Sequence, residues 1–75
     1  MTTIKQVLQA IITLAENNDI PEAMAANNVL DAYCWENPDD SITDLINIFI
    51  NSVMNQNYKK VERIVEYARN YLEDL

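Results

Sequence analysis

Apolar residues recur at helical spacing in four stretches of this sequence, and short polar segments separate the stretches. In the first, apolar side chains follow the i, i+3, i+4, i+7 spacing that places them on one face of a helix. These are Ile4, Val7, Leu8, Ile11, Leu14 and Ala15. Thr3 and Gln6 have the spacing of a capping box, and Asn17-Asn18 supplies a stop. A helix is therefore predicted over about residues 3–16.

The second stretch begins where Asp19, a residue able to cap a helix, precedes Pro21, which a first helical turn tolerates. Its apolar stripe consists mostly of small side chains, which allow another helix to approach closely: Ala23, Ala26, Leu30, Tyr33 and Cys34. The pattern predicts a helix over about residues 20–36. Asn27-Asn28 in its middle is able to kink or split that helix.

The third stretch is the most apolar of the chain and begins at Ser41, which has the residue type of an N-cap. Its predicted core face holds Ile42, Leu45, Ile46, Phe49, Val53 and Met54. A helix is predicted over about residues 41–55. Because the chain has no glycine, we expect asparagine to adopt the left-handed conformation that glycine usually supplies at helix ends.

The fourth stretch predicts a helix over about residues 57–74. Its heptad-like seam consists of Val61, Ile64, Val65, Ala68, Leu72 and Leu75. Short connections favour antiparallel neighbours, so the sequence predicts an all-α, small antiparallel bundle of three to four helices. Residues 1–75 are predicted to form a single helical domain. A chain of this length buries only a modest core, so a bound partner or oligomerisation, such as a homodimer, is expected.

Composition excludes several kinds of chemistry. There is one cysteine and no histidine, which rules out an internal disulfide, the usual Cys/His zinc sites and catalysis through imidazole. The absence of glycine excludes Gly-rich phosphate loops. We therefore expect no enzyme activity, no cofactor and no metal. No apolar run is long enough to span a membrane and no signal peptide is visible, so we expect a cytoplasmic protein without a membrane contact.

The distribution of charge is uneven. The net charge is −7, and no lysine or arginine occurs between Lys5 and Lys59. Eight carboxylates lie in that interval: Glu16, Asp19, Glu22, Asp31, Glu36, Asp39, Asp40 and Asp44. Acids near a helix start are stabilised by the macrodipole, which accounts for several positions. It does not account for the missing cations, because ordinary surfaces intersperse both signs.

These observations predict a partner-binding surface. We expect electrostatic contacts from Asp31, Glu36, Asp39, Asp40 and Asp44, and apolar anchoring from Trp35 and Met24 on a second face of the helix over 20–36. Carboxylates on a rigid frame can imitate phosphate spacing and steer association with a basic groove. The predicted function is a non-enzymatic acidic protein-binding module. It is expected to be a phage- or immunity-type inhibitor of a basic, nucleic-acid-handling protein, such as a nucleic-acid mimic.

The sequence disfavours two other binding functions. An EF-hand loop in "NPDDSITD" is disfavoured, because the stretch lacks the required glycine and terminal glutamate. Direct binding of nucleic acid is disfavoured too, since the basic residues of the last predicted helix alternate with acids able to pair with them. These bases are Lys59, Lys60, Arg63 and Arg69, and the acids are Glu62, Glu66 and Glu73.

Two further alternatives remain. The first is a homo-oligomeric structural or accessory protein whose acidity serves solubility. The second begins at Asp40-Ser41-Ile42, which resembles part of the Gly-x-Asp-Ser-Leu motif of acyl and peptidyl carrier proteins, themselves acidic four-helix domains. The resemblance covers three residues, and Pro38 stands at the position of the motif's glycine. It implies a phosphopantetheine group attached to Ser41.

Overall fold

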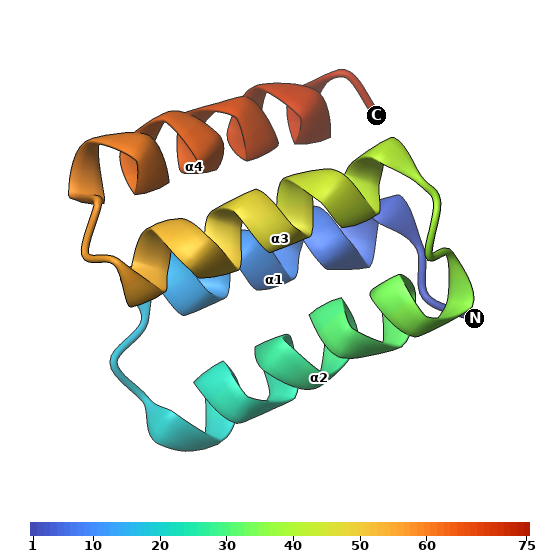
Figure 1. Cartoon of the computed structure of the whole chain (residues 1–75), viewed down its shortest axis with the longest axis horizontal. Coiled ribbons are helices and arrows are strands. Elements are labelled where there is room, and N and C mark those ends of the chain that lie inside the picture. The colour runs from blue at the N-terminus through green and yellow to red at the C-terminus, as the bar shows by residue number, and fades with distance from the viewer.

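The computed structural model describes all 75 residues and contains four helices (Figure 1). They are α1 (Ile4–Glu16), α2 (Ile20–Glu36), α3 (Ser41–Met54) and α4 (Tyr58–Glu73). The predicted all-α bundle is confirmed, and every helix begins and ends close to its predicted bounds. α2 runs without interruption through Asn27 and Asn28, so the kink considered from the sequence does not occur.

α1 is the central helix of the bundle. It packs against all three other helices, and most extensively against α2 and α4. Figure 1 shows α1 behind α3, with α4 on one side and α2 on the other. Val7, Leu8 and Ile11 of α1 are fully buried for this reason. Consecutive helices run antiparallel.

The core forms where the apolar stripes of the four helices meet. Its largest fully buried side chains are Phe49, Leu8, Ile11, Leu30 and Val7. Burial of each such side chain contributes about 1.5–3 kcal/mol. Cys34 lies half-buried at the edge of this core, and burial raises the pKa of its thiol. A thiol with a raised pKa is less available as a nucleophile.

The helix starts use side-chain caps, although one differs from its prediction. The predicted capping box of α1 is present: the Gln6 amide donates to the Thr3 hydroxyl at 3.2 Å, and the Thr3 amide donates to the Gln6 side chain at 2.8 Å. For α3, Asp40 rather than Ser41 is the N-cap, and its Oδ1 accepts from the Ile42 amide at 3.2 Å. Ser41 is instead the first helical residue.

The α3–α4 turn also differs from expectation, because Gln56 is the only residue with a positive φ, at 57°. The asparagines that end α1, α2 and α3 all have negative φ. The amides of Gln56 and Asn57 donate to the carbonyls of Val53 and Ser52 at 3.1 and 2.9 Å. This is the bonding pattern of a Schellman motif, which requires a left-handed residue at the position Gln56 occupies.

Three residues predicted to face the core are exposed instead. Val53 and Met54 are 44% and 76% exposed, and Leu75 is 67% exposed. Val53 is four residues after Phe49 and so continues the same stripe of α3. It lies in the last turn of α3, where the bundle ends and no further helix covers it. Leu75 lies beyond the end of α4.

Candidate protein-binding surface

Four of the predicted carboxylates gather where α2 ends and α3 begins. We call Glu36, Asp39, Asp40 and Asp44 the acidic corner. Its residues belong to the last turn of α2, the connection and the first turn of α3. In Figure 1 this corner lies at the right-hand end of the bundle, with both chain termini. Three of these side chains are exposed, and the fourth, Asp40, is half-buried.

Asp40 is committed to the fold. Its carboxylate accepts hydrogen bonds from the hydroxyl of Tyr33, a buried residue of α2, and from the Ile42 amide. The bond from Tyr33 is the main cause that lowers the pKa of Asp40, and the Ile42 amide adds to it. The same bond, with burial, raises the pKa of Tyr33 to about 12. Asp40 therefore joins α2 to α3 and is a weaker candidate for partner contact than the sequence suggests.

Glu36 also has an internal role. It accepts a hydrogen bond from the Thr2 hydroxyl at 3.0 Å and a longer one from the Thr2 amide at 3.5 Å. These bonds tie the N-terminal segment to the end of α2. The carboxylates of Asp31, Asp39 and Asp44, by contrast, take part in none of the side-chain hydrogen bonds or the ion pair of the chain, and they remain free for a partner.

Trp35 is the most exposed aromatic residue of the chain, at 89%. It lies on the outer face of α2, one turn after Asp31 and next to Glu36. Met24 is on the same face and 62% exposed, but it precedes Trp35 by about three turns, or about 16 Å. The structure thus places Trp35 beside the acidic corner and Met24 at the opposite end of α2.

The remaining acids of the cation-free interval lie at the other end of the bundle, so the charge does not form one continuous surface. Glu16 forms an ion pair with Arg69 of α4. Glu22 accepts a hydrogen bond from the Asn17 side chain. The expectation that no cation offsets these acids is wrong for Glu16, because α4 brings Arg69 to it across 53 residues of sequence.

The first turns of α4 carry basic side chains that are unpaired, contrary to the prediction from sequence. Lys59, Lys60 and Arg63 are exposed, and none forms an ion pair, since the Arg69–Glu16 pair is the only one in the chain. The expected pairing with neighbouring glutamates of α4 is therefore not formed. Lysines at a helix start oppose the macrodipole, and α4 has no acid in its first turn. The unfavourable position of these lysines at a helix start was the feature of the sequence that could have marked them as unpaired.

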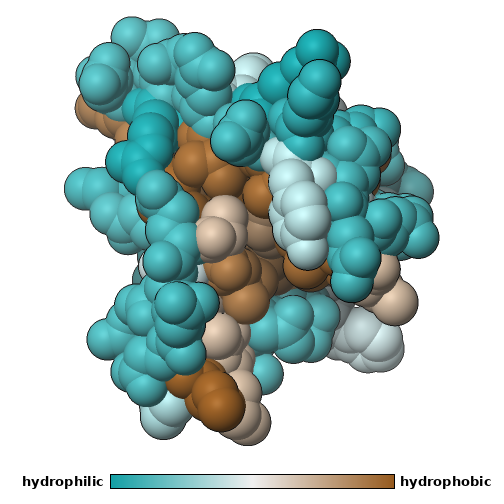
Figure 2. All heavy atoms as spheres, turned by 90° about the vertical axis from the view of Figure 1, so that its left-hand side faces the viewer, coloured by the Kyte–Doolittle hydropathy of each residue, from teal (hydrophilic) through white to brown (hydrophobic).

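Five exposed apolar side chains gather at the end of the bundle opposite the acidic corner. We call Ile20, Met24, Val53, Met54 and Tyr58 the open end. They come from the start of α2, the end of α3 and the start of α4. Figure 2 looks onto this end and shows hydrophobic atoms in a hollow between hydrophilic side chains. Ile20 and Met24, with Leu14 and Ala23, line a depression between α1 and α2.

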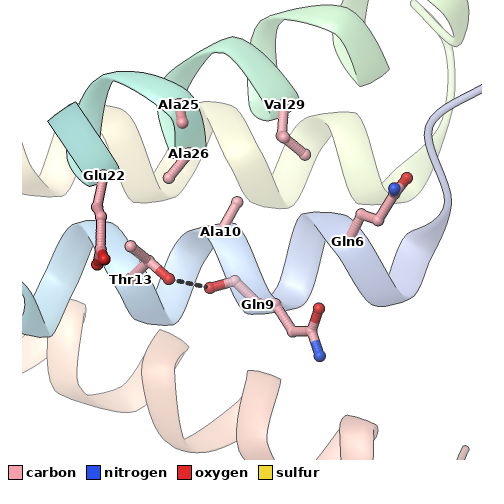
Figure 3. Close-up of a pocket in the computed structure, with 8 residues that line it drawn as sticks. All are labelled: Gln6, Gln9, Ala10, Thr13, Glu22, Ala25, Ala26 and Val29. Carbon is pink, nitrogen blue, oxygen red and sulfur yellow. Dashed lines mark hydrogen bonds between the residues drawn. The ribbon is translucent and has the colours of Figure 1, made fainter.

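A shallow groove also runs between α1 and α2 (Figure 3). Ala10 of α1 faces Ala26 and Val29 of α2, and Glu22 lies at one end. Thr13 donates its hydroxyl to the Gln9 carbonyl at 2.9 Å, so this hydroxyl is already bonded within α1. The groove contains one titratable group, Glu22, and no pair of a nucleophile and a base.

Ser41, the residue implied by the carrier resemblance, is exposed at the start of α3. Its hydroxyl donates to Asp40 Oδ1 at 3.4 Å.

No group of three carboxylate or thiol side chains is arranged to hold a metal ion. None of the four helices combines the length and the apolar character needed to cross a membrane. Comparisons with protein families, curated proteins and solved structures return no match.

Proposed function

We propose that this chain is a non-enzymatic, acidic protein-binding module that docks on a basic partner through Trp35 and the carboxylates around it. The observation that carries the proposal is the exposure of Trp35, at 89%, on the outer face of α2 beside Asp31, Glu36 and Asp39. A tryptophan in water is a large uncovered apolar surface, and tryptophans are enriched among the residues that dominate binding energy.

The charges around Trp35 favour a basic partner. No lysine or arginine occurs in α2 or α3 or in the connection between them, so these elements present no positive side chain to a basic partner. Free carboxylates steer such a partner into contact and raise the association rate at low salt. The outer carboxylates extend around the corner from α2 to α3, since Asp31 lies on one helix and Asp44 on the other.

A groove that binds nucleic acid is the kind of basic surface that such carboxylates fit, because it is built to accept a row of phosphates. We therefore propose that the module acts as an inhibitor or antagonist of a nucleic-acid-handling protein, in the cytoplasm, by occupying that groove. The fold supports this role, since four capped or packed helices hold the carboxylates on a rigid frame.

The proposal is tested by affinity capture with the immobilised chain, followed by direct binding to the recovered protein after purification. We expect a basic protein whose binding weakens at high salt and whose nucleic acid is displaced by the module. The Asp31→Lys/Asp39→Lys variant should lose binding by at least tenfold. It leaves Asp40 and Glu36 intact, because these two carboxylates support the fold.

Glu66→Lys/Glu73→Lys is the matched control, because it changes the net charge equally on α4, a helix that does not contact α2. The control should retain binding. Equal binding by both double variants would refute the acidic surface, and nucleic acid that stays bound to the partner would refute inhibition.

A further inference from the structure

We propose that the open end of one copy of this chain receives the Trp35 surface of a second copy, so that copies associate head to tail. The two surfaces lie at opposite ends of the same bundle. Each carries exposed apolar side chains, and the free carboxylates near Trp35 are opposite in charge to the lysines at the start of α4. This inference concerns the regulation of the proposed binding surface and rests on Trp35 being part of an interaction surface.

The open end is a continuation of the hydrophobic core that reaches solvent. Val53 lies on the stripe of α3 that buries Ile46 and Phe49, yet it is 44% exposed because no helix covers the last turn. Ile20 and Met24 are 71% and 62% exposed beside the half-buried Leu14. Apolar surface gathered in this way and rimmed by polar groups is typical of an interaction site.

The charges at the α4 side of this end favour an acidic occupant. Lys59 and Lys60 follow Tyr58 directly in the first turn of α4, and neither has an ion-pair partner. Glu16 is paired with Arg69. Asp19 and Glu22, at the α2 side of this end, and Glu62 on α4 keep their negative charge.

The Trp35 surface has the opposite character. An exposed indole stands among free carboxylates, with Asp31 one turn before it and Asp39 in the following connection. The exposed Val53, Met54 and Tyr58 lie at the α3–α4 turn, next to Lys59 and Lys60. The second copy can thus place Trp35 against these apolar side chains while Asp31 and Asp39 meet the two lysines. An indole buries about 150–250 Å², whereas a standard interface buries about 1,600 Å², so the contact is weak and depends on concentration.

When two copies associate in this way, the pair still has one unoccupied open end and one unoccupied Trp35 surface. Further copies can then add, and association gives chains or rings rather than a symmetric dimer. Each contact covers one Trp35 surface, and a basic partner must displace the neighbouring copy before it can bind. Self-association therefore lowers the fraction of chains available to a partner.

The test uses the purified chain alone, so that it does not depend on any partner. Sedimentation velocity of the wild type should show species that grow with protein concentration and dissociate at high salt. Trp35 is the only tryptophan, and its emission should shift to shorter wavelength over the same concentration range. Lys59→Glu/Lys60→Glu and Trp35→Ala should each remain monomeric. Lys5→Glu, on α1, is the control and should associate as the wild type does.

A mixture of the two monomeric variants gives the decisive result. Trp35→Ala keeps its open end and Lys59→Glu/Lys60→Glu keeps its Trp35, so one interface is intact. We expect a 1:1 pair and nothing larger. A monomeric wild type, association that survives both variants, or a mixture that stays monomeric would each overturn the proposal. None of these results affects the test with a basic partner, so failure of self-association is distinguishable from failure of the proposed function.

Discussion

The hydroxyl of Tyr33 donates a hydrogen bond to the carboxylate of Asp40 and so joins the buried side of α2 to the start of α3. Asp40 also caps α3 through the Ile42 amide. One carboxylate therefore fixes both the corner between two helices and the first turn of the second. The free carboxylates and Trp35 lie on either side of this bond, which holds the proposed binding surface in place.

Tyr33→Phe removes this hydrogen bond and should make the protein less resistant to denaturant at neutral pH. The difference between the variants should shrink on acidification. The pKa of Asp40 is lowered in the folded state, so its contribution is present above the ordinary aspartate range and is lost as pH falls through the folded pKa. Denaturant unfolding across the acid range checks this. A difference that stays constant with pH would contradict the role given to Asp40.

Alkaline pH should weaken the fold through the same residue. The pKa of Tyr33 is raised from 10.0 to about 12, so its contribution is fully present below pH 10 and is lost as pH rises through about 12. Tyr33→Phe should lack this component of the loss. Asp40→Asn should bring the pKa of Tyr33 down, and absorbance of tyrosinate during titration measures that change directly. An unchanged titration curve in Asp40→Asn would count against the hydrogen bond.

Gln56→Gly should stabilise the protein by about 0.5–1 kcal/mol. Gln56 has a φ of 57°, a conformation that costs residues with a Cβ about 1–2 kcal/mol, and the gain is reduced by the greater chain entropy of glycine when unfolded. Asn55→Gly is the control, because Asn55 has a φ of −89° and gains nothing from glycine. Equilibrium unfolding compares the two, and equal effects would show that Gln56 is not strained.

Phe49 and Val53 lie four residues apart on one stripe of α3 but should respond differently to truncation. Phe49 is fully buried, and Phe49→Ala should cost about 3–5 kcal/mol, a large part of the stability expected for a domain of this size. Val53→Ala should cost less than about 1 kcal/mol, because Val53 is 44% exposed. Thermal unfolding of both variants checks the boundary between the core and the open end. Similar losses would show that Val53 is covered in solution.

The sequence predicted the fold well because helix formation here is governed by local patterns. Apolar spacing located all four helices, and the capping box of Thr3 and Gln6 marked the start of the first. Apolar spacing failed to predict burial at the helix ends, because exposure there depends on where the neighbouring helices lie. Val53 has the spacing of a core residue, and only the arrangement of neighbouring helices leaves it uncovered.

The candidate site was predictable in part for the same reason. Helical periodicity placed Trp35 outside the apolar stripe of α2, but it left open whether Trp35 is exposed or covers the end of the bundle. The engagement of Asp40 by Tyr33 and of Glu16 by Arg69 depends on contacts between helices, which residue spacing does not encode. The free lysines of α4 were misjudged because glutamates at i+3 and i+4 could have paired with them, yet the ion pair that forms crosses to α1 instead.

The most direct test of the proposed function is the fluorescence of Trp35, the only tryptophan, during titration with the captured basic partner. A partner without tryptophan, or one labelled to remove its signal, makes the emission specific to this chain. The proposal predicts a shift to shorter wavelength at saturation, with binding that weakens steeply as salt is raised. Emission that stays at the wavelength of exposed tryptophan when the partner is fully bound would contradict it.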